Sequence, residues 1–267
     1  MIKTILLTGA SDGIGLETAK KLAVLGHHLI IHGRNKSKIE SVKSELMALP
    51  NVSKIDTIIA DLSDLQQVAT FAKKIISDYT RLDILINNAG VFKVPNPVNA
   101  EGLDVRFVVN TIAPYLLTQL LTPLLGKNGR VVNLSSAAQA PVNMQALIGE
   151  VRLEDMQAYA QSKLGIRLWT AAMSLIEHAP TCISVNPGSL LASKMVKEGF
   201  GIDGNDLSIG ADILVLITLD DEMLQHNGEY FDNDAGRFSA DIPATEISRM
   251  AKQLVSTMDK MFERYQV

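Results

Sequence analysis

A tyrosine and a lysine stand four positions apart in "DMQAYAQSKLG" (155–165), a run of good helix formers. Residues four apart lie on one face of a helix, so Tyr159 and Lys163 would be neighbours. A tyrosine hydroxyl can give a proton to a carbonyl oxygen or take one from an alcohol, but its ordinary pKa is about 10. A nearby ammonium group in a partly dehydrated cleft lowers that pKa. Many helices carry this spacing for no purpose, so the rest of the chain must decide.

A glycine-rich stretch near the start of the chain is the second candidate for chemistry. "TGASDGIG" (8–15) directly follows the apolar run "IKTILL" and opens a helical pattern. Its glycines at positions 9, 13 and 15 let the backbone turn tightly and approach a pyrophosphate, which the helix N-terminus then stabilises. The spacing only approximates the dinucleotide fingerprint GxGxxG, and the missing GK[ST] ending disfavours a nucleotide triphosphatase. A plain strand-to-helix turn is the alternative.

Strands and helices that alternate along the chain must position both candidates. Almost continuous apolar runs predict strands at 2–7, 28–32, 54–60, 82–87, 129–135, 181–186 and 228–233. Long helices are expected at about 101–125 and 156–178, and Ser63 with Gln66 predicts a capping box after the third strand. This alternation is typical of a parallel sheet covered on both faces. We therefore expect an α/β fold, with residues 1–267 in one doubly wound domain of about seven parallel strands.

Composition is ordinary for a soluble globular protein. Hydrophobic residues make up 47% of the 267 positions and charged residues 20%, and the net charge of −4 indicates neither a nucleic-acid partner nor a polybasic membrane patch. The first apolar run reaches Gly9 too early for a signal peptide or a spanning helix, and "ADILVLITL" is short. The single cysteine, Cys182, lies in the apolar run "CISV" and is expected to be a buried thiol. We expect a cytoplasmic protein that binds no membrane.

No metal site is expected. The five histidines show no ligand spacing with cysteine or carboxylates, and His27 and His28 suit the entry of the second strand. "FDNDAGRF" (231–238) has acidic spacing that hints at calcium, but the twelve-residue calcium loop is missing, so a final strand and turn is the simpler interpretation. Trp169 is expected in core or subunit packing.

Six motifs in register make the chain resemble the short-chain dehydrogenases/reductases over nearly its whole length. They are "TGASDGIG" (8–15), "NNAG" (87–90), Asn110 in "VVNTIAP", "VVNLSS" (131–136), "YAQSK" (159–163) and "NPG" (186–188). The resemblance implies a Rossmann-type fold and a catalytic tetrad of Asn110, Ser136, Tyr159 and Lys163. It also implies a dinucleotide site whose expected residues are Gly9, Ser11, Asp12, Gly13, Ile14, Gly15, Asp61, Leu62, Asn88, Ala89, Gly90, Tyr159, Lys163, Pro187 and Gly188. In that site Asp61 and Leu62 would border the adenine, and "NNAG" would support the sheet beside the cofactor.

The resemblance gives each tetrad member a role. Tyr159 exchanges a proton with the substrate oxygen, while Lys163 lowers the pKa of that tyrosine and holds the nicotinamide ribose. Ser136 hydrogen-bonds the substrate oxygen, and Asn110 anchors a water that passes protons on from Lys163. The adjacent Ser135 is interpreted as a strand-end hydroxyl near the cofactor.

The spacing between the catalytic serine and tyrosine departs from the common family pattern. Ser136 and Tyr159 are 159 − 136 = 23 residues apart, whereas many members have a separation nearer thirteen. A longer spacing is familiar in the retinol-dehydrogenase-like branch, whose "YxxSKL" is similar to "YAQSKL" here. The extra residues fall in "QAPVNMQALIGEVRLED" (139–155) and are expected to form an excursion near the substrate mouth.

The end of the second strand predicts NADP(H) rather than NAD(H) as the cofactor. An Asp or Glu about twenty residues after the glycine turn would grip the ribose 2′-hydroxyl. The chain has Gly33 there, followed by Arg34, which favours a 2′-phosphate, and Lys36 adds positive charge. The alternative is that Arg34 is simply an exposed turn residue.

An apolar substrate under a mobile lid is expected from the segment at 189–206. Its sequence, "SLLASKMVKEGFGIDGND", mixes glycines at 199, 201 and 204 with large apolar residues, which are Leu190, Leu191, Met195, Val196 and Phe200. The glycines suit hinges of a loop that closes and excludes water. The opposite wall would come from Pro141, Val142, Met144 and Leu147 of the excursion. For Met195 and Val196, a short helix packed permanently on the core is the alternative.

These features together predict an NADP(H)-dependent oxidoreductase that transfers hydride between nicotinamide and a small, apolar carbonyl or alcohol. A non-catalytic dinucleotide-binding sensor of the same fold is one alternative, although all four tetrad positions are filled. A sugar-nucleotide epimerase or dehydratase is another, although it would need a larger C-terminal domain than the residues after Pro187 provide. The resemblance also implies a homodimer or homotetramer, built through the helices that follow the fourth and fifth strands.

Overall fold

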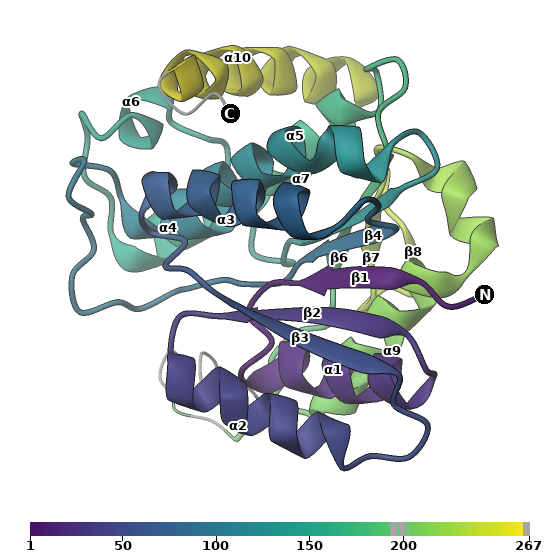
Figure 1. Ribbon diagram of the computed structural model, residues 1–267. Helices are drawn as coiled ribbons and strands as arrows, with labels where there is room; N and C mark the ends of the chain where they lie inside the picture. Colours follow the sequence, from purple (N-terminus) through teal and green to yellow (C-terminus); the bar gives the residue numbers. More distant parts are fainter. Residues whose placement is uncertain (193–196, 198–200, 202, 264–267) are drawn as a thin grey trace.

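The computed structural model describes residues 1–192, 197, 201 and 203–263, and these form an eight-stranded sheet between helices (Figure 1). The strands are β1 (Thr4–Leu7), β2 (His28–Gly33), β3 (Lys54–Ile59), β4 (Ile84–Asn87), β5 (Arg130–Leu134), β6 (Thr181–Asn186), β7 (Tyr230–Asp232) and β8 (Arg237–Phe238). Their order is β3-β2-β1-β4-β5-β6-β7-β8, and all neighbours pair in parallel except β7 and β8. The winding reverses between β1 and β4, the place at which open α/β sheets bind ligands beyond the carboxyl ends of their strands.

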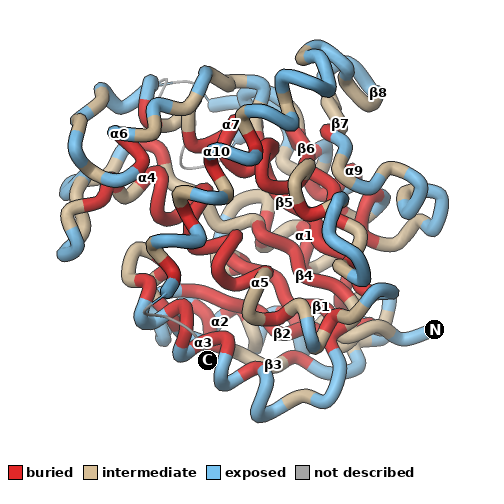
Figure 2. Tube along the Cα trace, turned by 90° about the horizontal axis from the view of Figure 1, so that it is seen from above, coloured by how far each residue is buried: buried red, intermediate tan, exposed pale blue. Residues whose placement is uncertain are grey.

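The central strands are apolar because helices cover both of their faces. All five residues of β5 are buried, and Ile5, Leu6 and Leu7 of β1 are fully buried. Successive side chains of a strand point to opposite faces, so Leu6 joins the core on one side of the sheet and its two neighbours join the core on the other. Figure 2 shows buried strands in the middle and exposed residues along the outer loops. The predicted doubly wound α/β fold is confirmed.

Two layers of helices cover the sheet (Figure 1). One layer consists of α1 (Gly13–Val24), α2 (Lys36–Met47) and α9 (Leu207–Leu219), and the other of α3 (Leu65–Asp78), α5 (Ala113–Leu125) and α7 (Asp155–Met173). The helix α10 (Ala244–Phe262) lies over this second layer. Shorter helical pieces are α4 (Val105–Phe107), α6 (Met144–Leu147) and the 3-10 helix η2 (Asp221–His226). A helix that connects two parallel strands runs back along the sheet, so α1 and α7 begin at the carboxyl edge.

The helix expected at about 101–125 is shorter and is not uniform. After α4, a π-helical turn, η1, spans Val108–Ile112, and α5 continues from it. Among the described residues, Val105–Leu125 is one helical stretch long and apolar enough to cross a membrane, with a mean hydropathy of 1.3. The sequence analysis considered only the N-terminal run and "ADILVLITL" and did not identify this stretch. Of its apolar window, 72% is buried inside the protein, as in a helix of a soluble core.

The start of α3 and the C-terminal end of the sheet differ in detail from the predictions made from sequence. The cap of α3 is Asp64, whose carboxylate accepts hydrogen bonds from the N–H groups of Gln66 and Gln67. The predicted capping box was wrong because Ser63 donates its hydroxyl to Asp61 instead. The acidic stretch at 231–238 forms the hairpin of β7 and β8, which adds one short antiparallel strand to the seven predicted.

Cys182 and Trp169 are fully buried, as predicted. Burial raises the pKa of the Cys182 thiol to about 12, so it is an inert core group. The ring of Trp169 lies 5.4 Å from that of Tyr115 on α5, which confirms core packing.

The C-terminal helix α10 packs on α7 and reaches α5. Asp259 accepts hydrogen bonds from the Tyr115 hydroxyl at 3.0 Å and from Gln119 Nε2 at 3.1 Å. The Phe262 ring lies 5.7 Å from the Tyr115 ring. This helix therefore covers α5 and α7, the helices through which the resemblance implied a homo-oligomer.

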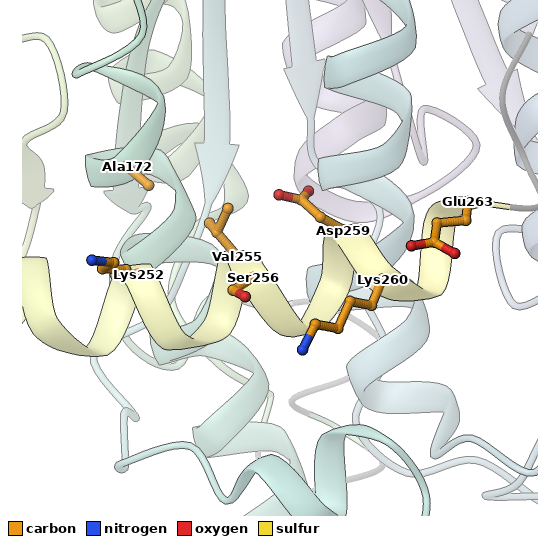
Figure 3. A pocket seen from close by; sticks show the side chains of 7 residues that line it. All are labelled: Ala172, Lys252, Val255, Ser256, Asp259, Lys260 and Glu263. Atoms are coloured by element: carbon orange, nitrogen blue, oxygen red, sulfur yellow. The ribbon is translucent and has the colours of Figure 1, made fainter.

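A shallow groove follows the seam between α7 and α10 (Figure 3). Ala172 lines it from α7, and the other lining side chains come from α10 and its C-terminal end. Ala172 follows Tyr159 by 172 − 159 = 13 residues, about 20 Å at ~1.5 Å per residue. The groove is thus distant from Tyr159 and from the carboxyl edge of the sheet.

Candidate active site

The carboxyl edge of the sheet gathers the four residues of the tetrad. Asn110 comes from η1, Ser136 from the loop that leaves β5, and Tyr159 and Lys163 from the first turns of α7. The side chain of Ser136 lies near the Tyr159 hydroxyl and counteracts part of the rise in the pKa of that tyrosine. The Nζ atom of Lys163 lies 5.7 Å from the centre of the Tyr159 ring. Side chains that are up to 53 residues apart in the sequence (163 − 110) thus meet at one place.

Lys163 is buried, and the backbone holds its ammonium group. Its Nζ donates to the carbonyl oxygen of Leu134 at 2.8 Å, and the residue is 4% exposed. Burial lowers the pKa of Lys163 to about 8. A Cβ atom built on Gly90 would lie 3.4 Å from this Nζ and from Asn110 Oδ1. The lysine therefore ends beside the "NNAG" segment, where the cofactor is expected.

The pKa of Tyr159 differs from the expectation. Burial raises this pKa above its ordinary value, and the nearby side chain of Ser136 offsets only part of the rise. Lys163 does not offset the rest, because its ammonium group points to the Leu134 carbonyl oxygen. The expected lowering by the lysine is thus not found in this structure. At neutral pH Tyr159 is a protonated hydroxyl, which suits proton donation to a carbonyl oxygen.

The two adjacent serines after β5 have different uses. Ser135 is buried and donates its hydroxyl to the carbonyl oxygen of Lys163 at 2.7 Å, which ties β5 to α7. Ser136 is partly exposed, and its Oγ accepts a hydrogen bond from the Ala138 N–H at 3.2 Å. Because Ser136 is also the serine near enough to lower the pKa of Tyr159, it is favoured as the serine that meets a substrate.

Asn110 holds the backbone of the neighbouring loop. Its side chain accepts the N–H of Val91 at 2.8 Å and donates to the Val91 carbonyl oxygen and to Ser162 Oγ, both at 2.9 Å. The π-helical turn around Asn110 is buried throughout, and such turns are frequent at functional sites. Asn110 thus fixes the loop after "NNAG" against α7. Its role in anchoring a water stays a prediction.

Phe92 packs on the tyrosine and was missed by the sequence analysis. The centres of the Phe92 and Tyr159 rings are 5.1 Å apart at an interplanar angle of 58°, and Phe92 is 5% exposed. It follows "NNAG" by two positions, but no local pattern distinguishes it from any other loop aromatic. Its contact restricts the orientation of the Tyr159 ring.

The glycine turn is packed from behind by "NNAG". Asn88 Nδ2 donates to the carbonyl oxygens of Thr8 at 2.9 Å and Gly9 at 3.0 Å. Gly9 has a φ of 67°, and a Cβ atom there would lie 2.8 Å from Ala89 Cα. A Cβ atom on Gly15 would lie 2.4 Å from Asn88 Nδ2. Gly9 and Gly15 must be glycines because Ala89 and Asn88 occupy the space that a Cβ atom at these two positions would need.

The N-terminus of α1 fits an anionic group. The helix begins at Gly13 and has no acidic residue in its first turn. Asp12 accepts the Gly13 N–H at 2.8 Å, and its other carboxylate oxygen pairs with Lys38 Nζ at 2.6 Å. Ser11 and Ile14, also expected at the cofactor, flank this cap. The negative charge of Asp12 is thereby compensated, and the backbone of the turn at a helix N-terminus suits a pyrophosphate.

The end of β2 lies beside the glycine turn. A Cβ atom built on Gly33 would lie 3.4 Å from Ser11 Cβ, so a side chain at position 33 would contact the glycine turn. Because this residue is a glycine, position 33 places no carboxylate there. Arg34 follows and is exposed. Lys38 pairs with Asp12 of the glycine turn, whereas the positive charge that Lys36 adds near a 2′-phosphate stays a prediction.

Asp61 and Leu62 follow β3 at the same edge. Gly33 pairs with Ile59, the last residue of β3. Asp61 Oδ1 accepts hydrogen bonds from the N–H and the hydroxyl of Ser63 at 2.9 and 2.7 Å, and Leu62 is buried. The two residues thus border the edge that Gly33 occupies, and their contact with adenine stays a prediction.

The hairpin of β7 and β8 holds the "NPG" turn. Asn233 Nδ2 donates to the carbonyl oxygen of Pro187 at 2.9 Å. The Asp234 carboxylate accepts the Asn186 amide and the Ser189 N–H, each at 2.9 Å. Gly188, with a φ of 123°, makes the turn between these anchors. The acidic spacing at 231–238 thus serves this turn, and within the described ranges no group of three or more His, Cys, Asp or Glu could hold a metal ion.

The lid expected at 189–206 lies partly outside the described residues, which leave out Met195, Val196, Gly199 and Phe200. Its base is closed by backbone pairing, because the Ala192 N–H donates to the Asn205 carbonyl oxygen at 2.6 Å and the Asn205 N–H donates to that of Leu190 at 2.7 Å. Leu190 is exposed there, with a φ of 53°.

Two residues of the expected lid belong to the packed base. Leu191 is 3% exposed and contacts the region of Gly210, where a Cβ atom would lie 2.6 Å from Leu191 Cδ1. A Cβ atom on Gly204 would lie 2.7 Å from the Ala192 backbone. In this structure Gly204 permits a close backbone approach, and its role as a hinge stays a prediction.

The excursion before Tyr159 contains the short helix α6. Leu147 is fully buried in the core, so the expectation that it lines a substrate wall was wrong. Val142 and Met144 are partly buried against the same core, and Pro141 is exposed. Of the four residues expected in that wall, only Pro141, Val142 and Met144 are still available to it.

Comparison with known proteins agrees with this geometry. The family model described as short chain dehydrogenase matches residues 3–200. Retinol dehydrogenase 12 of Mus musculus is 37% identical over 71% of this chain, and the match spans 62% of that relative, which is less than two thirds of its length. Retinol dehydrogenase 13 of Homo sapiens is 30% identical over 94% of this chain and 82% of that relative.

A solved structure extends the comparison to the fold. A short chain dehydrogenase from Burkholderia cenocepacia J2315 in complex with NADP has a TM-score of 0.69 and 26% identity, over 86% of this chain and 95% of that one. The chain belongs to the short chain dehydrogenase family of oxidoreductases.

Proposed function

We propose that the protein is an NADP(H)-dependent oxidoreductase that transfers hydride between a nicotinamide and a small, apolar carbonyl or alcohol. The observation that carries this proposal is that Tyr159 and Ser136 lie close together beside the buried Lys163. A substrate oxygen seated between the two hydroxyls would receive two hydrogen bonds. Carbonyl reduction and alcohol oxidation both need such stabilisation of the oxygen.

The nicotinamide, when bound, supplies or accepts the hydride. In reduction, Tyr159 gives its proton to the carbonyl oxygen, and Ser136 stabilises the negative charge that develops there. In oxidation, the ionised form of Tyr159 takes the alcohol proton, and a Lys163 ammonium group turned from Leu134 toward the tyrosine would favour that form. An ammonium group has three donors, and the bond to Leu134 uses one. The other donors of Lys163 would hold the ribose hydroxyls.

The preference for NADP(H) rests on charge at the end of β2. A carboxylate that would repel a 2′-phosphate is replaced by Gly33, and Arg34 is exposed beside it. Lys38 neutralises Asp12, the one acid of the glycine turn. The NADP complex of the Burkholderia relative supports a nicotinamide dinucleotide, and these side chains favour the phosphorylated form.

An apolar substrate is the choice that best fits the surroundings of Tyr159. Phe92 lies against the tyrosine ring, and Leu190 is exposed at the base of the segment that follows "NPG". Retinol, named in two relatives, is an apolar alcohol. Apolar side chains would stabilise such a substrate by roughly 25 cal/mol per Å² of surface buried.

We also propose that residues 1–267 act as one cytoplasmic domain. Both core clusters pack on the same sheet, which favours a single folding unit. A homodimer or homotetramer would need a surface other than the faces of α5 and α7 that α10 covers.

A cofactor-oxidation screen tests the proposal. Purified protein is mixed with NADPH or NADH and a panel of aldehydes, ketones and quinones that includes small charged carbonyls. We expect turnover of apolar carbonyls, with a kcat/KM at least about tenfold higher for NADPH than for NADH, because one charged hydrogen bond contributes about 1.5–3 kcal/mol. Cofactor binding without any turnover would indicate the non-catalytic sensor, and equal kcat/KM values would contradict the cofactor preference.

A further inference from the structure

The peptide of Ser136 lies just beyond the sheet and is held by side chains. The last ladder bond of β5 is donated by the Ser135 N–H to the Val185 carbonyl oxygen at 2.8 Å. The carbonyl oxygen of Ser136 instead accepts the hydroxyl of Tyr230 at 3.0 Å and Nε2 of Gln139 at 2.8 Å. Two donors on one carbonyl oxygen fix the orientation of the peptide from which the serine side chain projects.

A single arginine holds both of these donors. The guanidinium carbon of Arg167 lies 4.3 Å from the centre of the Tyr230 ring, and Nη1 donates to Gln139 Oε1 at 3.1 Å. Arg167 is 4% exposed, and Tyr230 is 5% exposed. A planar guanidinium can stack on a ring and donate in several directions at once, which a lysine ammonium cannot do.

The buried charge of Arg167 is compensated by Asp241. Nη2 and Nη1 donate to the two carboxylate oxygens at 2.6 and 3.3 Å. The Ser239 hydroxyl also donates to this carboxylate, at 2.8 Å. A forked ion pair of this kind fixes the plane of the guanidinium, and with it the contacts to Tyr230 and Gln139.

We propose that Arg167 and Tyr230 are positioning residues that set the Ser136 hydroxyl against Tyr159 and the substrate oxygen, an inference that rests on the proposed oxidoreductase function. Arg167 follows Tyr159 by 167 − 159 = 8 residues on α7. The helix that carries the acid–base tyrosine therefore also carries the group that fixes the serine peptide. Tyr230 and Asp241 lie beyond residues 3–200, the part matched by the family model. The C-terminal segment thus contributes to the geometry of the catalytic edge.

Tyr230→Phe tests the inference, because it removes one hydroxyl and keeps the ring under Arg167. We expect kcat with NADPH and the best carbonyl to fall about tenfold, which equals about 1.4 kcal/mol. The KM and the dissociation constant for NADPH should stay within twofold, since the glycine turn and Lys163 are unchanged. Arg167→Lys should lower kcat as well, because the lysine cannot hold Tyr230 and Gln139 together.

A double-mutant cycle with Ser136→Ala distinguishes positioning of the serine from general support of the core. If Tyr230 acts through Ser136, adding Tyr230→Phe to Ser136→Ala should not lower the residual kcat further. A further tenfold fall in the double variant would overturn the inference, because the hydroxyl would then act elsewhere.

Tyr79→Phe is the matched control. Its hydroxyl donates to Asp56 at 2.7 Å, and Tyr79 is the C-cap of α3, outside the tetrad and its network. We expect wild-type kcat for this variant. A Tyr230→Phe protein with wild-type kcat would overturn the inference alone, whereas a wild-type protein without turnover on any carbonyl would overturn the proposed function and the inference together.

Discussion

Two regions at the carboxyl edge of the sheet are built in different ways: the tetrad around Tyr159, here the catalytic edge, and the end of β2 with Lys38 and Asp12, here the specificity edge because we propose that it selects the cofactor. At the catalytic edge, Lys163 is 4% exposed and the carbonyl oxygen of Ser136 accepts two side-chain donors. At the specificity edge, Arg34 is exposed, and the side chains of Lys38 and Asp12 are 49% and 59% exposed in their ion pair. Buried hydrogen bonds hold the catalytic edge, whereas a solvent-exposed ion pair holds the specificity edge.

This difference separates what each region can control. Buried groups with several partners hold reacting atoms in place, and removing one leaves others unsatisfied. Exposed charges contribute little to stability and are screened by salt, but they can select between ligands that differ by a phosphate. We therefore expect substitutions at the catalytic edge to remove turnover, and substitutions at the specificity edge to change only the choice of cofactor.

Lys163→Ala should have the largest effect. The variant loses the charge beside Tyr159 and the donors for the ribose, so kcat should fall by about 10²–10⁴-fold, the range of acid–base catalysis. The dissociation constant for NADPH should rise as well. Steady-state kinetics and a fluorescence titration measure the two effects. Lys74→Ala, which removes an exposed lysine paired with Asp78 on α3, is the control and should change neither.

The stability contributed by Lys163 should depend on pH. Its pKa is about 8 in the folded protein and ordinarily 10.5. Between these values the unfolded chain binds a proton that the folded protein lacks, so the free energy of unfolding rises with pH through this window. Below pH 8 Lys163 is protonated in both the folded and the unfolded chain, and burial of its charge lowers the free energy of unfolding by about 3 kcal/mol. Above pH 10.5 both states are neutral, and this cost disappears.

Urea unfolding of the wild type and of Lys163→Met isolates this contribution. The difference in free energy of unfolding, wild type minus variant, should increase from pH 8 to pH 10.5. A difference that stays constant with pH would contradict the conclusion that burial lowers the pKa of Lys163.

Gly15→Ala should affect both the fold and the cofactor site. Its Cβ atom would lie 2.3 Å from the Gly9 carbonyl oxygen and 2.4 Å from Asn88 Nδ2. We expect the free energy of unfolding to fall by about 1–3 kcal/mol, as in other overpacked sites, and the affinity for NADPH to fall. Gly236→Ala, at a φ of 65° with no atom within 4 Å, should cost less. Equal losses in urea unfolding would show that crowding at Gly15 is not the cause.

Lys38→Ala should have the smallest effect and should act on cofactor choice alone. Loss of its charge uncovers Asp12 beside the expected 2′-phosphate, so kcat/KM for NADPH should fall a few-fold, in line with about 1 kcal/mol or less for an exposed charge. The value for NADH should not change, and added salt should shrink the difference. Lys36→Ala, two residues earlier on α2, should leave both values unaltered. A larger effect of Lys36→Ala than of Lys38→Ala would contradict the role given to Lys38.

Much of the fold could be predicted because its signals are local. Apolar runs such as "TILL" and "RVVNL" are buried on both faces and therefore read as strands of a covered parallel sheet. The tetrad could be selected because its motifs keep their order along the chain. The glycine turn was recognised for the same reason, since its glycines are needed by the backbone itself.

The rest depends on contacts between distant segments. Tyr230 reaches Ser136 across 230 − 136 = 94 residues, and no local pattern marks either the tyrosine or Phe92 as a neighbour of the site. The raised pKa of Tyr159 follows from burial, and the Lys163 ammonium group points to the Leu134 carbonyl oxygen. The spacing of the two residues determines neither feature. Leu147 has the same apolar side chain whether it faces a substrate or the core.

The central claim is that the hydroxyl of Tyr159 transfers the proton. Tyr159→Phe removes only this hydroxyl and keeps the ring against Phe92, so the fold and the affinity for NADPH should stay within a few-fold of wild type. Single-turnover oxidation of NADPH, with an apolar carbonyl that the wild type reduces, should slow by about a thousandfold, within the range of acid–base catalysis. A variant that kept a tenth of wild-type turnover would contradict the account.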